Sequence, residues 1–151
     1  MAIVARGSLE KGHSLVNTER TKAYTVTWTG RAGSLILVAV NLSSSLSFHR
    51  DPGLQALCEG MQRVQPDIVV GDFNAPRRSR ALEPLPKGFR HAYDCAGSGW
   101  SYTWPVPCPV YAIDQCIVGS RVRPIRYFLV STLRSDHRAQ VMDFAVPETT
   151  K

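Results

Sequence analysis

The sequence contains no apolar segment long enough to cross a bilayer. Its longest apolar run extends from Leu35 to Val40, whereas a membrane-spanning helix needs about 20 apolar residues. The apolar stretch after Met1 precedes the first basic residue and is too short for a secretory signal peptide. We therefore expect a cytoplasmic protein without a membrane span.

The sequence also lacks paired cysteines, internal repeats and linker-like segments. Its four cysteines form no C-x-x-C pair, so a thiolate metal site is not indicated and free thiols in a reducing compartment are expected. A length of 151 residues with 44% hydrophobic and 20% charged residues fits one ordinary globular domain. We predict a single domain over residues 1–151.

Acidic residues are too few to balance the basic ones. The chain has 18 Lys and Arg against 12 Asp and Glu, a formal charge of +6, and basic residues cluster at 77–80 and again between 121 and 138. Such a surface is compatible with a phosphate-bearing partner. It is equally typical of a solvated surface, so charge alone leaves both interpretations open.

Hydrophobic periodicity predicts a series of strands with one clear helix. Short apolar or alternating segments predict strands, and Asp51-Pro52 followed by apolar residues at helical spacing predicts a helix that ends before Pro66. The predicted strands cover residues 2–5, 23–29, 34–42, 67–74, 112–119, 123–130 and 139–146. Residues 75–110, rich in Pro, Gly and Arg, are expected to form long loops with a short helix.

The strand–helix–strand order around residue 60 predicts the α/β class. We expect a mixed, mainly antiparallel sheet with helices on one face and with strands from both ends of the chain in that one sheet.

Three acidic residues stand where predicted strands meet loops: Asp72 after IVVG, Asp114 in AIDQCIV, and Asp136 beside His137 in SDHR. Strand ends that open into loops commonly form functional sites in α/β proteins. Carboxylate, amide and imidazole groups together suit an oxygen-rich divalent metal site with a base. A single acid of this kind is usually a turn former, but three in distinctive strings favour a site.

The strings GDFN, TWP, IDQ and SDHR, in this order, resemble the endonuclease/exonuclease/phosphatase superfamily, which includes nucleases, sphingomyelinases and inositol phosphatases. The segments MAIVARGSL, LILVAVNL and GWSYTWP extend the resemblance over nearly the whole chain. The resemblance implies half of a four-layered α/β sandwich and divalent-metal-dependent phosphoester hydrolysis.

The resemblance implies a role for each residue of these strings. Asp72 would orient or deprotonate the attacking water, and Asn74 would donate a hydrogen bond to the phosphate. Asp136 and Asp72 would be the metal-side carboxylates, for Mg²⁺ or Mn²⁺. His137 would bind the scissile phosphate, with its ring held by Asp114. Phosphate ester hydrolysis needs such a base, such donors and charge neutralisation.

Three further residues are candidate substrate contacts. Arg77 and Arg78 lie in the loop that the resemblance places near the substrate groove. Asn41 stands where the family has a histidine, and an amide cannot supply a proton at neutral pH.

The resemblance covers only the later part of the family's domain. We therefore expect a truncated domain that lacks the family's metal-binding asparagine and glutamate, and weak Mg²⁺ binding. The sheet face assigned to Ile36, Val38, Val40, Ile68 and Val70 would lack its cover, and an apolar patch of that size is not tolerated in a soluble monomer. A homodimer, a complementary chain with the front half, or rearranged loops would cover it.

Two functions remain open from the sequence. The first is a phosphoester hydrolase, incomplete or weakly active as an isolated chain, acting on a nucleic acid, lipid head group or inositol phosphate. The second is a non-catalytic remnant of the fold that binds nucleic acid or protein.

Overall fold

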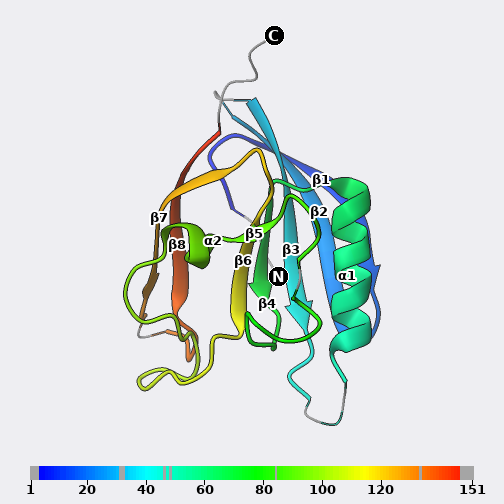
Figure 1. Ribbon diagram of the computed structural model, residues 1–151. Coiled ribbons are helices and arrows are strands. Elements are labelled where there is room, and N and C mark those ends of the chain that lie inside the picture. The colour runs from blue at the N-terminus through cyan, green and yellow to red at the C-terminus, as the bar shows by residue number, and fades with distance from the viewer. Residues whose placement is uncertain are drawn as a thin grey trace.

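The computed structural model describes residues 4–30, 33–45, 47, 49–83, 85–132 and 134–146. It contains a six-stranded sheet in the order β1-β2-β3-β4-β6-β5, a two-stranded sheet β7-β8, and two helices (Figure 1). The elements are β1 Ser8–Asn17, β2 Thr21–Gly30, β3 Gly33–Leu42, α1 Asp51–Val64, β4 Ile68–Asp72, β5 Arg90–His91, α2 Ala92–Ala96, β6 Asp114–Val118, β7 Arg123–Val130 and β8 Ala139–Ala145.

The larger sheet is mixed and mainly antiparallel. Only β3 and β4 pair in parallel, and α1 makes the crossover between them, as parallel neighbours require. The other neighbouring strands of this sheet pair antiparallel. The predicted α/β class with a mixed, mainly antiparallel sheet is thereby confirmed. The two helices do not share one face, since α1 packs in one core cluster and Ala92 of α2 in the other.

Helix α1 covers one face of the sheet. Pro52 stands in its first turn, and Leu54, Leu57 and Met61 on one side of the helix are almost completely buried. They pack in one core with Val38 of β3 and Val69 of β4. The 3.6-residue spacing of these apolar residues is therefore what attaches the helix to the sheet.

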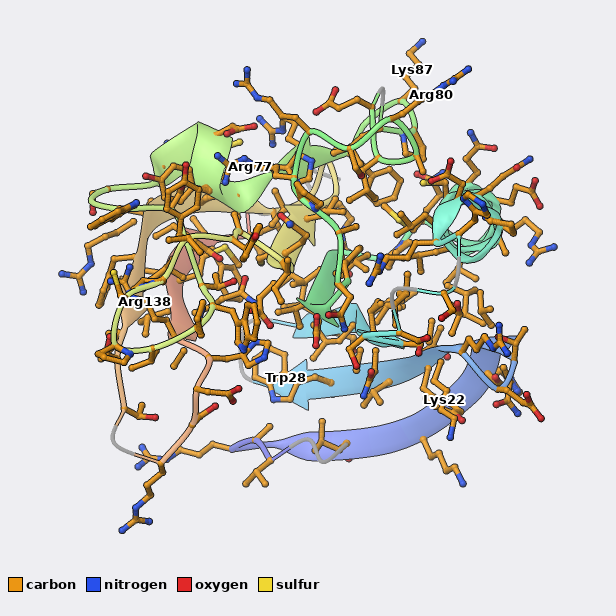
Figure 2. The ribbon with its side chains drawn as sticks, turned by 90° about the horizontal axis from the view of Figure 1, so that it is seen from below. Lys22, Trp28, Arg77, Arg80, Lys87 and Arg138 are labelled. Atoms are coloured by element: carbon orange, nitrogen blue, oxygen red, sulfur yellow. The ribbon has the colours of Figure 1, made fainter. Side chains whose placement is uncertain are left out.

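The hairpin β7-β8 covers part of the opposite face. Ile68 and Cys116 of the large sheet pack there with Tyr127 and Leu129 of β7, and Figure 2 shows α1 and β7-β8 on opposite sides of the sheet. The expectation that the C-terminal strands join the same sheet is wrong, because β7 and β8 pair only with each other among the described strands.

The predicted uncovered face also needs correction. Val38 and Val40 face α1, whereas Ile68 and Val70 pack in the cluster under β7-β8. The five residues therefore do not share one face, since neighbouring residues of a strand point to opposite sides. The hairpin covers part of the second face from within the chain, and Leu37 and Val70 there are partly buried.

Most predicted boundaries agree with the structure to within two residues, but the first strand does not. The prediction placed it at 2–5, of which residues 2 and 3 lie outside the described part, and Val4 and Ala5 are not in a strand. The first strand is instead β1, an edge strand whose side chains are mostly exposed. All four cysteines are free, and among the described helices none is long and apolar enough to span a membrane.

Candidate active site

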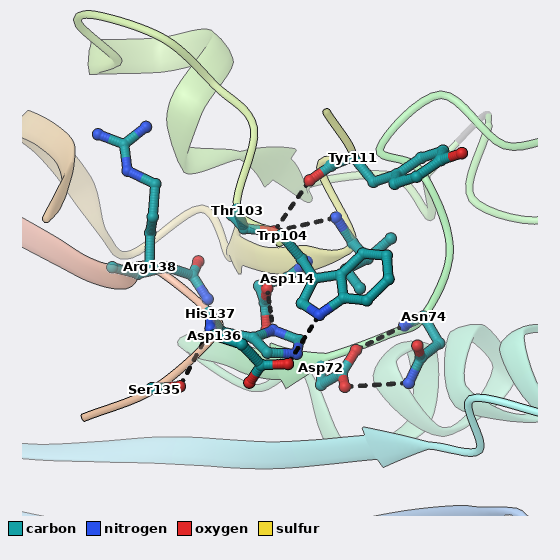
Figure 3. A network of polar contacts seen from close by, with 12 residues as sticks. Asp72, Asn74, Thr103, Trp104, Tyr111, Asp114, Ser135, Asp136, His137 and Arg138 are labelled. Carbon is teal, nitrogen blue, oxygen red and sulfur yellow. Dashed lines mark hydrogen bonds and ion pairs between the residues drawn. The ribbon is translucent and has the colours of Figure 1, made fainter. Parts of the chain in front are cut away.

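The ends of three neighbouring strands bring the candidate residues together. Asn41 of β3 lies directly opposite Asp72 of β4, and Asp72 lies directly opposite Asp114 of β6. Directly opposed residues point to the same face of a sheet, with strands about 4.8 Å apart. The three side chains therefore form one row across the sheet at the end where β3 and β4 terminate. Figure 3 shows Asp72 and Asp114 of this row with His137 beside them.

Asp72 is held by the backbone and side chain of Asn74. Its Oδ1 accepts a hydrogen bond from the Asn74 amide at 2.8 Å, and its Oδ2 accepts one from Asn74 Nδ2 at 3.0 Å. Asn74 has a φ of 45°, a conformation that asparagine tolerates better than most residues. Burial raises the pKa of the Asp72 carboxyl, against the lowering effect of these hydrogen bonds. The carboxylate is thus oriented and its basicity is increased.

The side chain of Asn74 has no amide hydrogen to spare in this arrangement. Its Nδ2 donates to Leu42 O at 2.7 Å as well as to Asp72, and an amide nitrogen carries two hydrogens. Donation to a phosphate, the predicted role of Asn74, would require the bond to Asp72 to open when substrate binds.

His137 reaches this row from the loop between β7 and β8. Its Nδ1 lies 2.8 Å from Asp114 Oδ2, and because a carboxylate only accepts, Nδ1 carries the proton and Nε2 is left for other partners. Burial on its own would lower the pKa of His137, but the hydrogen bond and charge of Asp114 and the charges of Asp72 and Asp136 outweigh it and raise that pKa above 6.5.

A titration of His137 checks this pair. We expect its pKa, followed by NMR in EDTA, to lie above 6.5, and Asp114→Asn to lower it by about one unit because an adjacent carboxylate shifts a pKa by that order. Since the folded-state pKa is the higher one, the pair stabilises the fold fully below pH 6.5, and this stabilisation is lost as pH rises through the folded-state pKa. An unchanged pKa in Asp114→Asn would contradict the assigned pairing.

Asp114 itself is positioned by a buried threonine that sequence reasoning missed. Thr103, 1% exposed, accepts hydrogen bonds at Oγ1 from the amides of Ile113 and Asp114 at 3.1 and 3.2 Å. It stands in the TWP string, next to Trp104, so the string was recognised but this role was not. Gln115, which is also buried, joins two loops near the site, because its side-chain amide donates hydrogen bonds to the carbonyls of Ala75 and Ala112.

Asp136 lies at the exposed edge of the site. The indole Nε1 of Trp104 donates to its Oδ2 at 2.9 Å, and this bond is the main reason that its pKa is lowered. Trp104 also contacts the ring of Tyr111, with centroids 5.9 Å apart. The SDHR and TWP strings therefore meet in space, although 32 residues separate Trp104 from Asp136.

A cavity of about 1080 Å³ is lined by most of these groups but not by Arg77 or Arg78. Asn41, Asp72, Asn74, Asp136 and His137 line it together with Glu19, Arg20, Lys22, Arg50, Trp104 and Tyr111.

The arginines proposed from the sequence are placed elsewhere. Arg77 pairs with Asp94 at 3.1 Å and lies over the ring of Tyr93, and neither Arg77 nor Arg78 lines the cavity. The structure therefore brings Asn41 to the site but not the two arginines.

The donor atoms suit a divalent cation. Among the described residues, Asp72, Asp114 and His137 offer three ligand atoms within 4.8 Å of one another; Asp136, proposed from the sequence, is not in this group. Asp114 and His137 already bind each other through Oδ2 and Nδ1, so the other carboxylate oxygens and Nε2 of His137 remain as available ligand atoms. Mg²⁺ is commonly held by one or two carboxylates and several waters, which these residues fit.

The Endonuclease/Exonuclease/phosphatase family profile matches residues 2–137. The chain belongs to this family. Comparison with curated protein sequences gives no match.

Solved structures of the endonuclease/exonuclease/phosphatase fold resemble the chain closely in shape. An Enterococcus faecalis protein of unknown function is 17% identical, with a TM-score of 0.70 over 93% of this chain and 66% of its own. Danio rerio TDP2, complexed with a single-strand DNA product, is 20% identical, with a TM-score of 0.70 over 92% and 67%. A Bacteroides thetaiotaomicron mannosyl-6-phosphatase is 15% identical, with a TM-score of 0.67 over 90% and 66%.

The TM-scores of these three structures establish the fold, whereas sequence identities this low do not establish a shared substrate. The chain spans about two thirds of the length of these three proteins. The family and the fold class predicted from the sequence are therefore confirmed.

Proposed function

We propose that this chain is a divalent-metal-dependent phosphoester hydrolase of the endonuclease/exonuclease/phosphatase type. The observation that carries the proposal is the convergence of Asp72, held by Asn74, and His137, held by Asp114, on one open cavity. A carboxylate base and an oriented imidazole on either side of a phosphate are the groups that this hydrolysis requires.

In this proposal each residue of the row has a distinct task. Asp72 accepts the proton of the attacking water, helped by the raised pKa that burial produces. His137 donates from Nε2 to a phosphate oxygen, because Asp114 holds Nδ1 and favours the charged ring. Asn41 can donate a hydrogen bond through its amide but supplies no proton to a leaving group.

Asp72 would hold the cation. Asp136, which lines the same cavity but lies outside the group of three close ligand atoms, would add a second carboxylate. When bound, a divalent cation neutralises charge on the phosphate and lowers the pKa of a bound water.

The test is hydrolysis of bis-nitrophenyl phosphate, and nicking of plasmid DNA, with Mg²⁺ or Mn²⁺ and with EDTA. Metal-dependent turnover that scales with the purified chain supports the proposal. Turnover that is the same in EDTA contradicts it.

The second candidate function is a binding module that retains the fold without catalysis. It is favoured by Asn41, which lines the cavity where a proton donor would serve the leaving group. A chain that binds a phosphate-bearing ligand but gives no turnover with either metal would support this alternative.

Calorimetry provides a further prediction about the cation. Because few carboxylates are available and each has another task, we expect a Mg²⁺ dissociation constant in the millimolar range or weaker, or about 4 kcal/mol of binding free energy at most. Asp72→Asn should weaken the binding further, whereas Asp143→Asn, in a surface pair with Arg126, should not. A micromolar constant for the unmodified chain would show that a strong ligand has been overlooked.

A further inference from the structure

The row of strand-end residues continues past the catalytic groups onto β2. Lys22 lies directly opposite Asn41, which lies directly opposite Asp72. Lys22 therefore emerges on the same face as Asp72, two strands away, or about 10 Å at the usual strand spacing. Lys22 thus places an ammonium group on the same face of the sheet as the proposed site of the reacting phosphate, two strands away.

Two arginines line the same cavity as Lys22. Arg20, from the turn before β2, and Arg50, from the segment before α1, line it together with Lys22. Glu19 and the site carboxylates Asp72 and Asp136 line the same cavity, so the cations lie next to the acids of the proposed catalytic row. A substrate with a single phosphate, placed at Asp72 and His137, would make no use of Lys22, whereas a polynucleotide strand would present a neighbouring phosphate to it.

Two aromatic rings, Trp104 and Tyr111, line the same cavity. Trp104 is fixed by its bond to Asp136, and Tyr111, 54% exposed, packs against it with ring planes 32° apart. Exposed rings next to a cationic groove are the combination with which proteins bind single strands, because every base can stack. Sugar phosphates and inositol phosphates have no aromatic group to place there.

The arginine-rich loop does not take part in this surface. Arg80 and Lys87 line a separate cavity beside α1, and Figure 2 shows them at the opposite edge of the molecule from Lys22. Arg77 is paired with Asp94. Cations of this loop, such as Lys87, can therefore be replaced as controls for the loss of a positive charge outside the proposed surface.

We propose that the surface formed by Lys22, Arg50, Trp104 and Tyr111 binds single-stranded nucleic acid, with a base stacked on Tyr111 and a neighbouring phosphate at Lys22. The inference takes the position of the reacting phosphate from the proposed hydrolase function. Binding itself needs no turnover, so the two are tested separately.

The experiment measures fluorescence anisotropy of a labelled single strand of about 12 nucleotides in EDTA. A second strand of equal length is abasic throughout, so that it keeps the phosphates but has no bases. We expect Lys22→Ala to weaken binding of both strands and to reduce the salt dependence, log K against log salt, by about 0.7. We expect Tyr111→Ala to weaken binding of the normal strand about fivefold or more and to leave the abasic strand unaffected.

Two matched variants complete the design. Tyr111→Phe keeps the ring and Lys87→Ala removes a cation outside the surface, and both should bind within about twofold of the unmodified chain. Equal binding of normal and abasic strands, an equal loss in Lys87→Ala and Lys22→Ala, or no binding at tens of micromolar would each overturn the inference. Bis-nitrophenyl phosphate hydrolysis without strand binding would refute this inference alone, and strand binding without hydrolysis would refute only the proposed function.

Discussion

Replacement of Asp72 by asparagine is expected to lower kcat for phosphodiester hydrolysis by about 100- to 10,000-fold, the range that a general base contributes. The amide keeps the size of the side chain but cannot accept a proton, and it accepts hydrogen bonds at one atom where the carboxylate accepts at two, Oδ1 and Oδ2. The measurement is steady-state hydrolysis of bis-nitrophenyl phosphate at saturating metal.

The same variant should not unfold the protein. The pKa of Asp72 is raised in the folded state, mainly by burial, so at neutral pH its charge costs stability rather than adding to it. We therefore expect the Tm of Asp72→Asn to equal or exceed that of the unmodified chain. Asp143→Asn, at an exposed position of β8, is the control that should keep full activity. Activity that survives Asp72→Asn would remove Asp72 from the mechanism.

Replacement of Gly71 by alanine is expected to lower the free energy of unfolding by about 3 kcal/mol and to abolish activity. Gly71 has a φ of 151°, and a Cβ there would lie 2.0 Å from the carbonyl oxygen of Val40 on β3. The backbone of β4 would have to move away from β3 at the residue that precedes Asp72. Urea unfolding, together with hydrolysis assays at a temperature where the variant is folded, measures both effects.

Gly88 supplies the matched control. Its φ is 90°, but a Cβ would meet nothing within 4 Å, so Gly88→Ala tests backbone strain without a clash. We expect it to cost about 1 kcal/mol and to leave activity unchanged. If the two variants lose the same stability, the close approach of β4 to β3 is not what requires glycine at position 71.

Local patterns were sufficient for most of the secondary structure. Helix α1 was predictable because Asp51-Pro52 begins it and its apolar residues recur at helical spacing. Strands β3, β4 and β7 were predictable from β-branched and apolar runs. Strand β1 was not, because its sequence SLEKGHSLVN is polar and it forms at the sheet edge, where pairing with β2 and not burial holds it.

The candidate site was predictable as a set of strings but not as a geometry. Asp72, Asn74, Asp114, Asp136 and His137 were identified from the strings that contain them. The resemblance implied that Asp114 holds the ring of His137, as it does in the structure. That Asn74 Nδ2 also donates to the Leu42 carbonyl, and so has no hydrogen left for a phosphate, depends on a contact between segments that the sequence does not relate. Thr103 was missed because a buried threonine that orients a neighbouring backbone resembles an ordinary core residue.

The sequence by itself determined the family, the α/β class, the helix and most strands, and the acids that stand at strand ends, because each of these depends on short-range patterns. Only the tertiary structure decided which strands pair, which face each side chain takes, and which charges share a cavity. Strand pairing and packing join residues far apart in the chain, so the hairpin β7-β8 leaves the main sheet to cover its face. For the same reason Lys22, inconspicuous in the sequence, lies directly opposite Asn41 and lines the same cavity as Asp72. The arginines of 77–80 lie outside this cavity.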